Sequence, residues 1–145
     1  MDFLTSLQVS ASALEAQRMK MNLIASNLAN AETTKTAEGG PYKKKIPILA
    51  EKNIQTGDRR NFKKTLEESI KGVEVVAVVK DGKNFKMKYD PGNPDADSNG
   101  FVKVPDINVM EEMVKLLSAT RAYEANVTAI NAAKNMAQKA LDIGK

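Results

Sequence analysis

The chain has 145 residues, a formal net charge of +4, and neither cysteine nor histidine. That composition removes thiol and imidazole nucleophiles, the usual zinc ligands and the commonest general base, and with them most catalytic sites. Lysine and arginine are interspersed with 18 acidic residues, which permits acidic partners without indicating nucleic-acid binding. We therefore expect no enzyme, no cofactor, no bound metal and no small-molecule substrate.

The opening run MDFLTSLQVSASALEAQ lacks both a basic stretch and a continuous apolar stretch. A cleavable export signal needs both of these features, and a membrane-spanning helix needs about 20 apolar residues in succession. Taken alone, these features predict a cytoplasmic protein.

The chain begins with a predicted amphipathic helix, from about Phe3 to Asn30. It contains neither glycine nor proline, and all five prolines of the chain lie between Gly39 and Pro105. Large apolar residues recur at every seventh position. They are Leu7, Leu14, Met21 and Leu28. This repeat is typical of a helix that packs along another helix.

A polar segment, AETTKTAEGGPY, follows from Ala31 to Tyr42 and predicts a linker that turns the chain at Gly39, Gly40 and Pro41. Three lysines come next, and the short apolar run Ile46 to Leu49 is interrupted by a proline. A proline inside such a run predicts an edge strand at best. Residues 51–71 are compatible with either a short amphipathic helix or a loose polar connector.

From Gly72 to Asp90 the apolar period changes to two, which predicts two strands. Asp81 and Gly82 form a tight-turn dipeptide between them, so we predict a β-hairpin in which these two strands pair with each other. A further strand near Phe101 to Val104 would complete the core of the middle segment.

The loop after this hairpin partly matches a calcium-binding EF-hand loop. Asp95, Asp97, Asn99 and Gly100 have the spacing of its first half, and Asp106 occupies its twelfth position. Prolines in and before the loop oppose the entering helix, and the twelfth residue is not the usual glutamate. We therefore favour a run of turns in which Asp and Asn side chains bond nearby backbone groups. A calcium- or polyanion-binding module, using this loop or the lysine-rich hairpin, is the alternative function.

A long helix is predicted from Asp106 to Gly144, with Asn108 as its N-cap and Glu111 and Glu112 in its first turn. Its apolar stripe alternates steps of three and four. The large side chains of this stripe include Met113, Leu116, Tyr123, Val127 and Ile130. Together with the N-terminal leucines they form a predicted assembly seam. Periodicity alone leaves open whether this seam joins subunits or only closes one domain.

These elements predict an α+β fold. The N- and C-terminal helices would pair as an antiparallel, coiled-coil-like hairpin, and the middle would form a small β-rich domain. The corresponding division is 1–31 for the first helix, 32–105 for the linker and β-rich domain, and 106–145 for the second helix.

Three stretches together resemble the bacterial flagellar basal-body rod proteins, and among these the proximal rod type. They are VSASALEAQRMKMNLIASNLANAETTKTAEGGPYKKK, YDPGNPDADSNGFVKVP and NVMEEMVKLLSATRAYEANVTAINAAKNMAQKALDIG. The residues that carry the family motifs are Asn27, Asn30, Gly39, Gly40, Pro41, Tyr42, Arg121, Tyr123 and Asn126.

This resemblance implies a structural subunit of the periplasmic rod, which transmits torque as a drive shaft. It also implies that the subunit leaves the cell without a cleavable signal, through the flagellar type III export apparatus. Its expected partners are further copies of itself, other rod proteins, the membrane-ring base and that export apparatus. The cytoplasmic prediction made from composition is replaced by this one.

Overall fold

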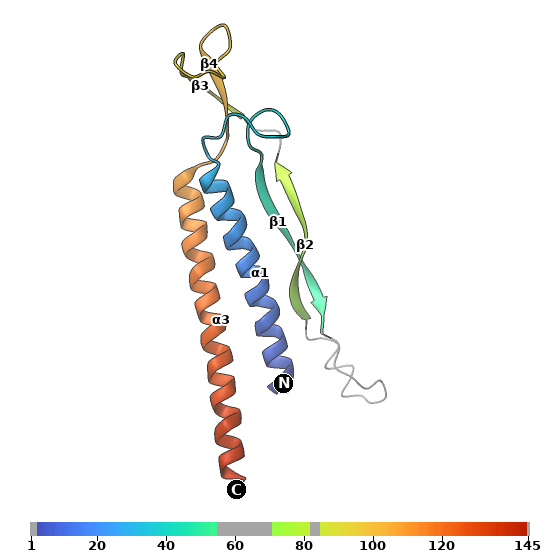
Figure 1. The fold of residues 1–145 in the computed structure, drawn as a ribbon. Helices are drawn as coiled ribbons and strands as arrows, with labels where there is room; N and C mark the ends of the chain where they lie inside the picture. Colours follow the sequence, from blue (N-terminus) through green and yellow to red (C-terminus); the bar gives the residue numbers. More distant parts are fainter. Residues whose placement is uncertain (1–2, 55–70, 82–84, 145) are drawn as a thin grey trace.

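The structure is a computed structural model that describes residues 3–54, 71–81 and 85–144. Helix α1, Phe3–Ala29, and helix α3, Val109–Ile143, lie side by side and run in opposite directions (Figure 1). Asn27 near the end of α1 contacts Glu112 near the start of α3, and Met21 contacts Thr120. The predicted α+β fold with an antiparallel helix pair is therefore confirmed.

The start of α3 follows from its sequence. The Asn108 side chain accepts hydrogen bonds from the backbone N–H groups of Met110 (3.1 Å) and Glu111 (3.4 Å). These are two of the N–H groups that the first turn of a helix leaves without a partner, so the N-cap prediction is confirmed.

The middle of the chain forms two antiparallel two-stranded sheets. Strand β1, Lys44–Asn53, pairs with β2, Lys71–Asp81, and strand β3, Phe85–Tyr89, pairs with β4, Phe101–Pro105. The strand predicted near Phe101 is thus confirmed. The predicted hairpin of β2 with β3 is wrong, because each of these strands has a different partner in the described residues.

The run around Pro47 is a full strand, longer than the sequence indicated. Pro47 lies opposite Val78 in the β1–β2 register. In a two-stranded sheet both strands are edges, so a residue without an N–H group can be accommodated on the side that faces away from the partner. A register shift follows, between Ile48 and Leu49.

Helix α1 lies in the middle of the molecule, between α3 and the β1–β2 sheet (Figure 1). At one end of the sheet, the Ser12 hydroxyl of α1 accepts a hydrogen bond from the backbone N–H of Val73 (3.2 Å). At the other end, Asn27 of α1 binds Lys45 of β1. The β3–β4 sheet lies beyond the end of the helix pair where α1 ends and α3 begins (Figure 1).

Few apolar residues are buried in the part of the chain that the structure describes, as expected of a chain with 5% aromatic residues. On the helices they are Ala16, Ile24, Ala119 and Ala133. The others are Tyr42 just before β1, Val102 in β4 and Ile107 between β4 and α3. The helix considered for residues 51–71 lies almost wholly outside the described residues. The division into 1–31, 32–105 and 106–145 stays a prediction.

Candidate assembly surface

The residues of the predicted seam are only partly covered inside the subunit. Leu7, Leu14, Met21 and Leu28 of α1 are half-buried, as are Leu116, Tyr123, Val127 and Ile130 of α3, whereas Met113 is exposed. The Thr120 hydroxyl contacts the Met21 sulfur at 3.5 Å, which places the two stripes against each other. Each stripe therefore retains apolar surface that the partner helix does not cover.

A second apolar stripe lies on α3 and is exposed along its whole length. Met110, Met113, Val114 and Leu117 are 70%, 50%, 66% and 53% exposed. Their spacing of three, four and seven residues places them on one face of the helix. We call these four residues the outer stripe. The predicted seam included Met113, and periodicity did not separate this second face from it.

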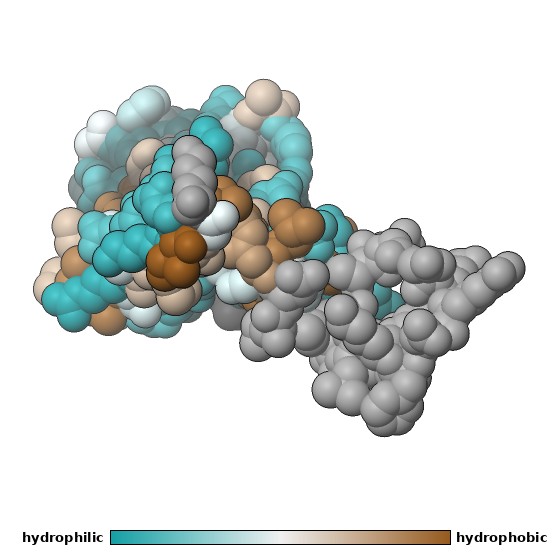
Figure 2. Space-filling view, turned by 90° about the horizontal axis from the view of Figure 1, so that it is seen from below, coloured by the Kyte–Doolittle hydropathy of each residue, from teal (hydrophilic) through white to brown (hydrophobic). Residues whose placement is uncertain are grey.

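Helix α3 also extends past the beginning of α1. It has 35 residues against 27 in α1, so at 1.5 Å per residue it is about 12 Å longer. The C-terminus projects beyond the N-terminus in Figure 1. Met136, Leu141 and Ile143 are exposed in this last part of α3, and Figure 2 shows hydrophobic patches among the hydrophilic surface at this end.

At the opposite end, a buried polar joint connects α1, α3 and β1. Its centre is Asn27, which is 1% exposed. The Asn27 amide donates to the carbonyl oxygen of Lys45 (2.9 Å), and its oxygen accepts from the N–H of Lys45 (2.9 Å) and from the Tyr42 hydroxyl (3.1 Å). One side chain of α1 thus holds the beginning of β1.

The joint also contains a buried carboxylate, Glu112, whose side chain is 1% exposed. It accepts a hydrogen bond from Asn27 (3.4 Å) and pairs with the ammonium groups of Lys44 (2.9 Å) and Lys115 (3.3 Å). Burial raises the pKa of Glu112, but the hydrogen bonds from Lys44, Lys115 and Asn27, together with the charge of Lys44, outweigh burial and leave that pKa below its usual value. Glu112 is therefore an ionised, paired carboxylate.

The remaining residues of the first family motif shape the segment between α1 and β1. Asn30 donates to the carbonyl oxygen of Ser26 (2.8 Å) and accepts from the Thr33 hydroxyl (3.2 Å). Gly39 and Gly40 have φ angles of +84° and +75°, which glycine adopts without steric cost. The turn they make with Pro41 brings Tyr42 back to α1, where its hydroxyl lies 3.1 Å from that of Ser26.

The second family motif lies on α3 and is less concentrated. Arg121 is exposed, whereas Tyr123 and Asn126 are half-buried. The Asn126 side chain donates to the carbonyl oxygen of Ala122 (3.0 Å) one turn earlier. The structure brings Asn27 and Tyr42 together, but it places the motif of α3 on another part of the molecule.

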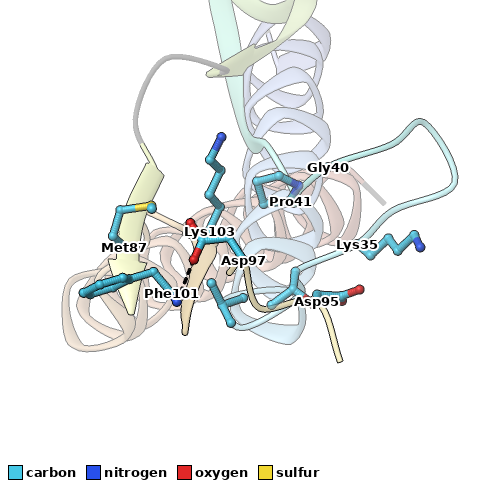
Figure 3. A pocket seen from close by; sticks show the side chains of 10 residues that line it. Lys35, Gly40, Pro41, Met87, Asp95, Asp97, Phe101 and Lys103 are labelled. Carbon is cyan, nitrogen blue, oxygen red and sulfur yellow. Dashed lines mark hydrogen bonds between the residues drawn. The ribbon is translucent and has the colours of Figure 1, made fainter. Parts of the chain in front are cut away.

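The loop between β3 and β4 contains an acidic residue, Asp97, that accepts hydrogen bonds from the backbone of its own turn. One oxygen of Asp97 accepts from the N–H groups of Asn99 (2.9 Å) and Phe101 (3.2 Å), the second bond being dashed in Figure 3, and Gly100 has a φ of +79°. Asp95 accepts from the Thr34 hydroxyl (2.7 Å) and lines a hollow of about 260 Å³. The preferred interpretation, a run of turns, is confirmed.

Neither binding alternative gains support. In the described residues no group of three or more acidic side chains could hold a metal ion. Three lysines of β2 and β3 already have acidic neighbours: Lys80 pairs with Glu38, Lys86 with Asp106 and Lys88 with Glu32. Among the same residues, no helix has the length and hydrophobicity needed to cross a membrane.

Sequence reasoning missed three members of the joint, Glu112, Lys44 and Lys45. It named Glu112 only as an acidic residue in the first turn of α3, and it gave the two lysines no structural role. Glu111 and Lys115 do form an exposed pair at a spacing of four, but Glu112 faces inward. Because Glu111 and Glu112 are adjacent and chemically identical, the local sequence does not indicate which of them is buried.

Two family descriptions and three individual proteins similar to this chain all name flagellar rod proteins. The family described as "Flagella basal body rod protein" matches residues 7–35, and "Flagellar basal body rod FlgEFG protein C-terminal" matches residues 98–143. The flagellar basal-body rod protein FlgC of Bacillus subtilis is 44% identical over 145 residues, with 97% of each chain covered. FlgC of Borreliella burgdorferi is 40% identical, covering 99% of this chain and 98% of its own, and FlgC of Salmonella typhimurium is 37% identical with both chains fully covered.

Proposed function

This chain belongs to the FlgC family of flagellar basal-body rod proteins, and we propose that it assembles through the apolar faces that its own fold leaves uncovered. It is a structural subunit of the bacterial flagellar rod, and it assembles with other rod components in the basal body. We further propose which surfaces of the subunit form contacts in the rod, that these contacts transmit torque, and by which route the subunit reaches the rod.

The outer stripe on α3 is the observation that carries this proposal. Four apolar residues exposed side by side on one helix face leave a patch that water solvates poorly, and such patches mark interaction sites. The seam residues add to it, because Leu14, Val127 and their neighbours are only half-buried in the helix pair. We assign the seam to assembly through this uncovered half.

The shape of the subunit supports a load-bearing role. Contacts between unlike surfaces of identical subunits need not close into a ring and can continue as a helical tube. Long helices that pack side by side in such a tube present many interdigitated side chains, and close-packed interiors resist deformation. A shaft built in this way would transmit torque, and the subunit would need no catalytic group to do so.

The export route and the membrane-ring contact belong to the same proposal. The resemblance to rod proteins favours passage through the flagellar type III export apparatus, followed by assembly on the membrane-ring base. The absence of cysteine is compatible with export as an unfolded chain, because no disulfide can form on the way.

The test is a charge placed in the outer stripe. Leu117→Asp leaves the interior of the subunit untouched, since Leu117 is exposed, but it would bury a carboxylate when the stripe is covered by a neighbour. In cells that lack their own copy of this protein, we expect Leu117→Asp to abolish rods in isolated basal bodies and swimming in soft agar.

The matched control is Ala129→Asp, which adds the same charge to α3 at an exposed residue that lies 12 positions beyond Leu117 and on a different side of the helix. It should support rods and swimming. Secretion of both variants, measured in the culture medium, separates failed assembly from failed export. Normal rods with Leu117→Asp would show that the outer stripe is not an assembly surface.

A further inference from the structure

Helix pairing alone does not determine how α1 and α3 are aligned. The apolar residues of α1 recur at intervals of seven from Leu7 to Leu28, so a slide of seven residues along α3 replaces one large apolar residue by another. Three of the four buried apolar residues described on the two helices are alanines, Ala16, Ala119 and Ala133, and small side chains of this kind fit several alignments. A seam of this kind needs a polar contact to select one register.

Asn27 and Glu112 are that contact within the helix pair. Both are 1% exposed, and they lie 3.4 Å apart across the two helices. In an alignment shifted by seven residues, Ala119 would replace Glu112 opposite Asn27. The amide and the carboxylate would then each lose a buried partner, and an unsatisfied buried polar group is costly.

The helix pair does not satisfy these two groups by itself. The Asn27 oxygen accepts both of its hydrogen bonds from Tyr42 and Lys45, and the Asn27 amide donates to the Lys45 carbonyl group. Glu112 pairs with Lys44 at 2.9 Å, closer than the 3.3 Å to Lys115 on its own helix. Tyr42, just before β1, and the first two residues of β1, Lys44 and Lys45, therefore complete a contact that belongs to the helices.

We propose that the polar joint is a conditional register lock: α1 and α3 pair in the observed alignment only when the beginning of β1 is docked against both helices. With β1 away, Asn27 and Glu112 no longer favour this alignment, because each has lost its main partners. The lock acts inside one subunit, so its test is independent of rod assembly.

Disulfide trapping can read the alignment directly, because the chain has no cysteine of its own. Met21→Cys with Thr120→Cys reports the observed register, in which these side chains touch. Met21→Cys with Val127→Cys reports a shift of seven residues. Each pair is placed in the purified full-length chain, oxidised under the same conditions, and quantified by mass spectrometry of the cross-linked peptides.

Three backgrounds test the proposal. In the otherwise unchanged chain, the 21–120 disulfide should dominate. In Asn27→Leu/Glu112→Leu, and in Tyr42→Phe/Lys44→Met, where both helix residues remain, the ratio of the 21–127 to the 21–120 disulfide should rise about tenfold or more. The matched control, Lys43→Met, removes an exposed lysine outside the joint and should leave the ratio unchanged.

Every other outcome counts against the lock. An unchanged ratio in Asn27→Leu/Glu112→Leu would show that apolar packing sets the register. An unchanged ratio in Tyr42→Phe/Lys44→Met alone would show that the lock does not depend on β1. Loss of helical circular dichroism in either variant, or absence of the 21–120 disulfide in the unchanged chain, would show that the joint does not act as a register device in this subunit.

Discussion

Asn27 binds Lys45 as a neighbouring strand would, donating to its carbonyl oxygen and accepting from its N–H group, both at 2.9 Å. A helix side chain thereby takes the place of a strand backbone at the beginning of β1. The β1–β2 sheet is thus attached to α1 at a defined residue, and not only by apolar contact.

Removing this side chain should destabilise the whole subunit. Asn27→Ala deletes the hydrogen bonds to Lys45 and Tyr42 and leaves the backbone groups of Lys45 without them, which should cost roughly 2 kcal/mol or more. Asn30→Ala is the control, because Asn30 is half-buried and bonds only within its own turn. Urea unfolding followed by circular dichroism compares the two. If both substitutions lowered the free energy of unfolding equally, the two hydrogen bonds between Asn27 and Lys45 would not stabilise the subunit more than the local bonds of Asn30.

Glu112 should make stability depend on pH. Its pKa in the folded protein lies below the usual value of a glutamate, because the bonds from its lysine partners outweigh burial. A lowered folded pKa gives a stabilisation that is complete above the unfolded pKa and is lost as the pH falls through the folded pKa. The destabilisation caused by Glu112→Gln, about 1–3 kcal/mol at neutral pH, should therefore shrink as the pH falls below the usual glutamate pKa of about 4.3.

Melting temperatures measured between about pH 3 and about pH 7 check this, because that range brackets the usual pKa of a carboxylate. The neighbouring Glu111→Gln serves as the control, since Glu111 forms an exposed pair with Lys115 and exposed pairs contribute little. A Glu112→Gln difference that stays constant across this range would contradict an ionised, stabilising Glu112.

Gly72 should resist any larger residue because it lies so close to α1. A Cβ atom at Gly72 would lie 2.6 Å from the Ser12 hydroxyl oxygen and 3.3 Å from Ser12 Cβ. Gly72→Ala should cost about 1–3 kcal/mol through this overlap, and Ser12→Gly should recover part of the loss in the double variant. Gly92→Ala is the control, because its nearest atom would be 3.8 Å away. Thermal melting compares these variants with the unchanged chain, and additive single effects would exclude the overlap.

The β3–β4 loop should depend on the oxygen of Asp97 and not on calcium. Asp97→Asn keeps an oxygen for the N–H groups of Asn99 and Phe101, whereas Asp97→Ala removes it. We expect Asp97→Ala to speed amide hydrogen exchange at these two positions and Asp97→Asn to leave it nearly unchanged. Calcium at millimolar concentration should not alter the melting temperature of the unchanged chain; a rise that disappears in Asp97→Ala would restore the binding alternative.

Local sequence determined the helices and the turns. The spacing of apolar residues and the absence of glycine and proline predicted both helices, and the cap at Asn108 predicted the beginning of α3. Each of these features acts within one or two turns of the chain. The turns around Asp97 and Gly100 were readable for the same reason, since the side chain bonds its own neighbours. The strands β2, β3 and β4 were also visible from their composition.

Strand pairing was decided by tertiary structure. Asp81 and Gly82 favoured a hairpin between β2 and β3, but in the structure β2 pairs with β1 along α1. In the observed pairing, Gly72 fits against Ser12 and Val73 donates to the Ser12 hydroxyl. Neither interaction can be predicted from an apolar pattern of period two, because the partner, Ser12, lies on a helix and is 61 residues from Val73 in the sequence.

For Asn27 and Glu112 of the polar joint, too, the sequence determined the secondary structure and the tertiary structure determined the contacts. Sequence alone determined that Asn27 and Glu112 are helical, and the family resemblance marked Asn27 without giving it a role. Only the tertiary structure decided that both side chains are buried and face each other, 85 positions apart in the chain. The physical reason is that burial of a charge is tolerable only where partners from other segments converge. Lys44, Lys45 and Tyr42 reach that place only after the chain has turned back on itself.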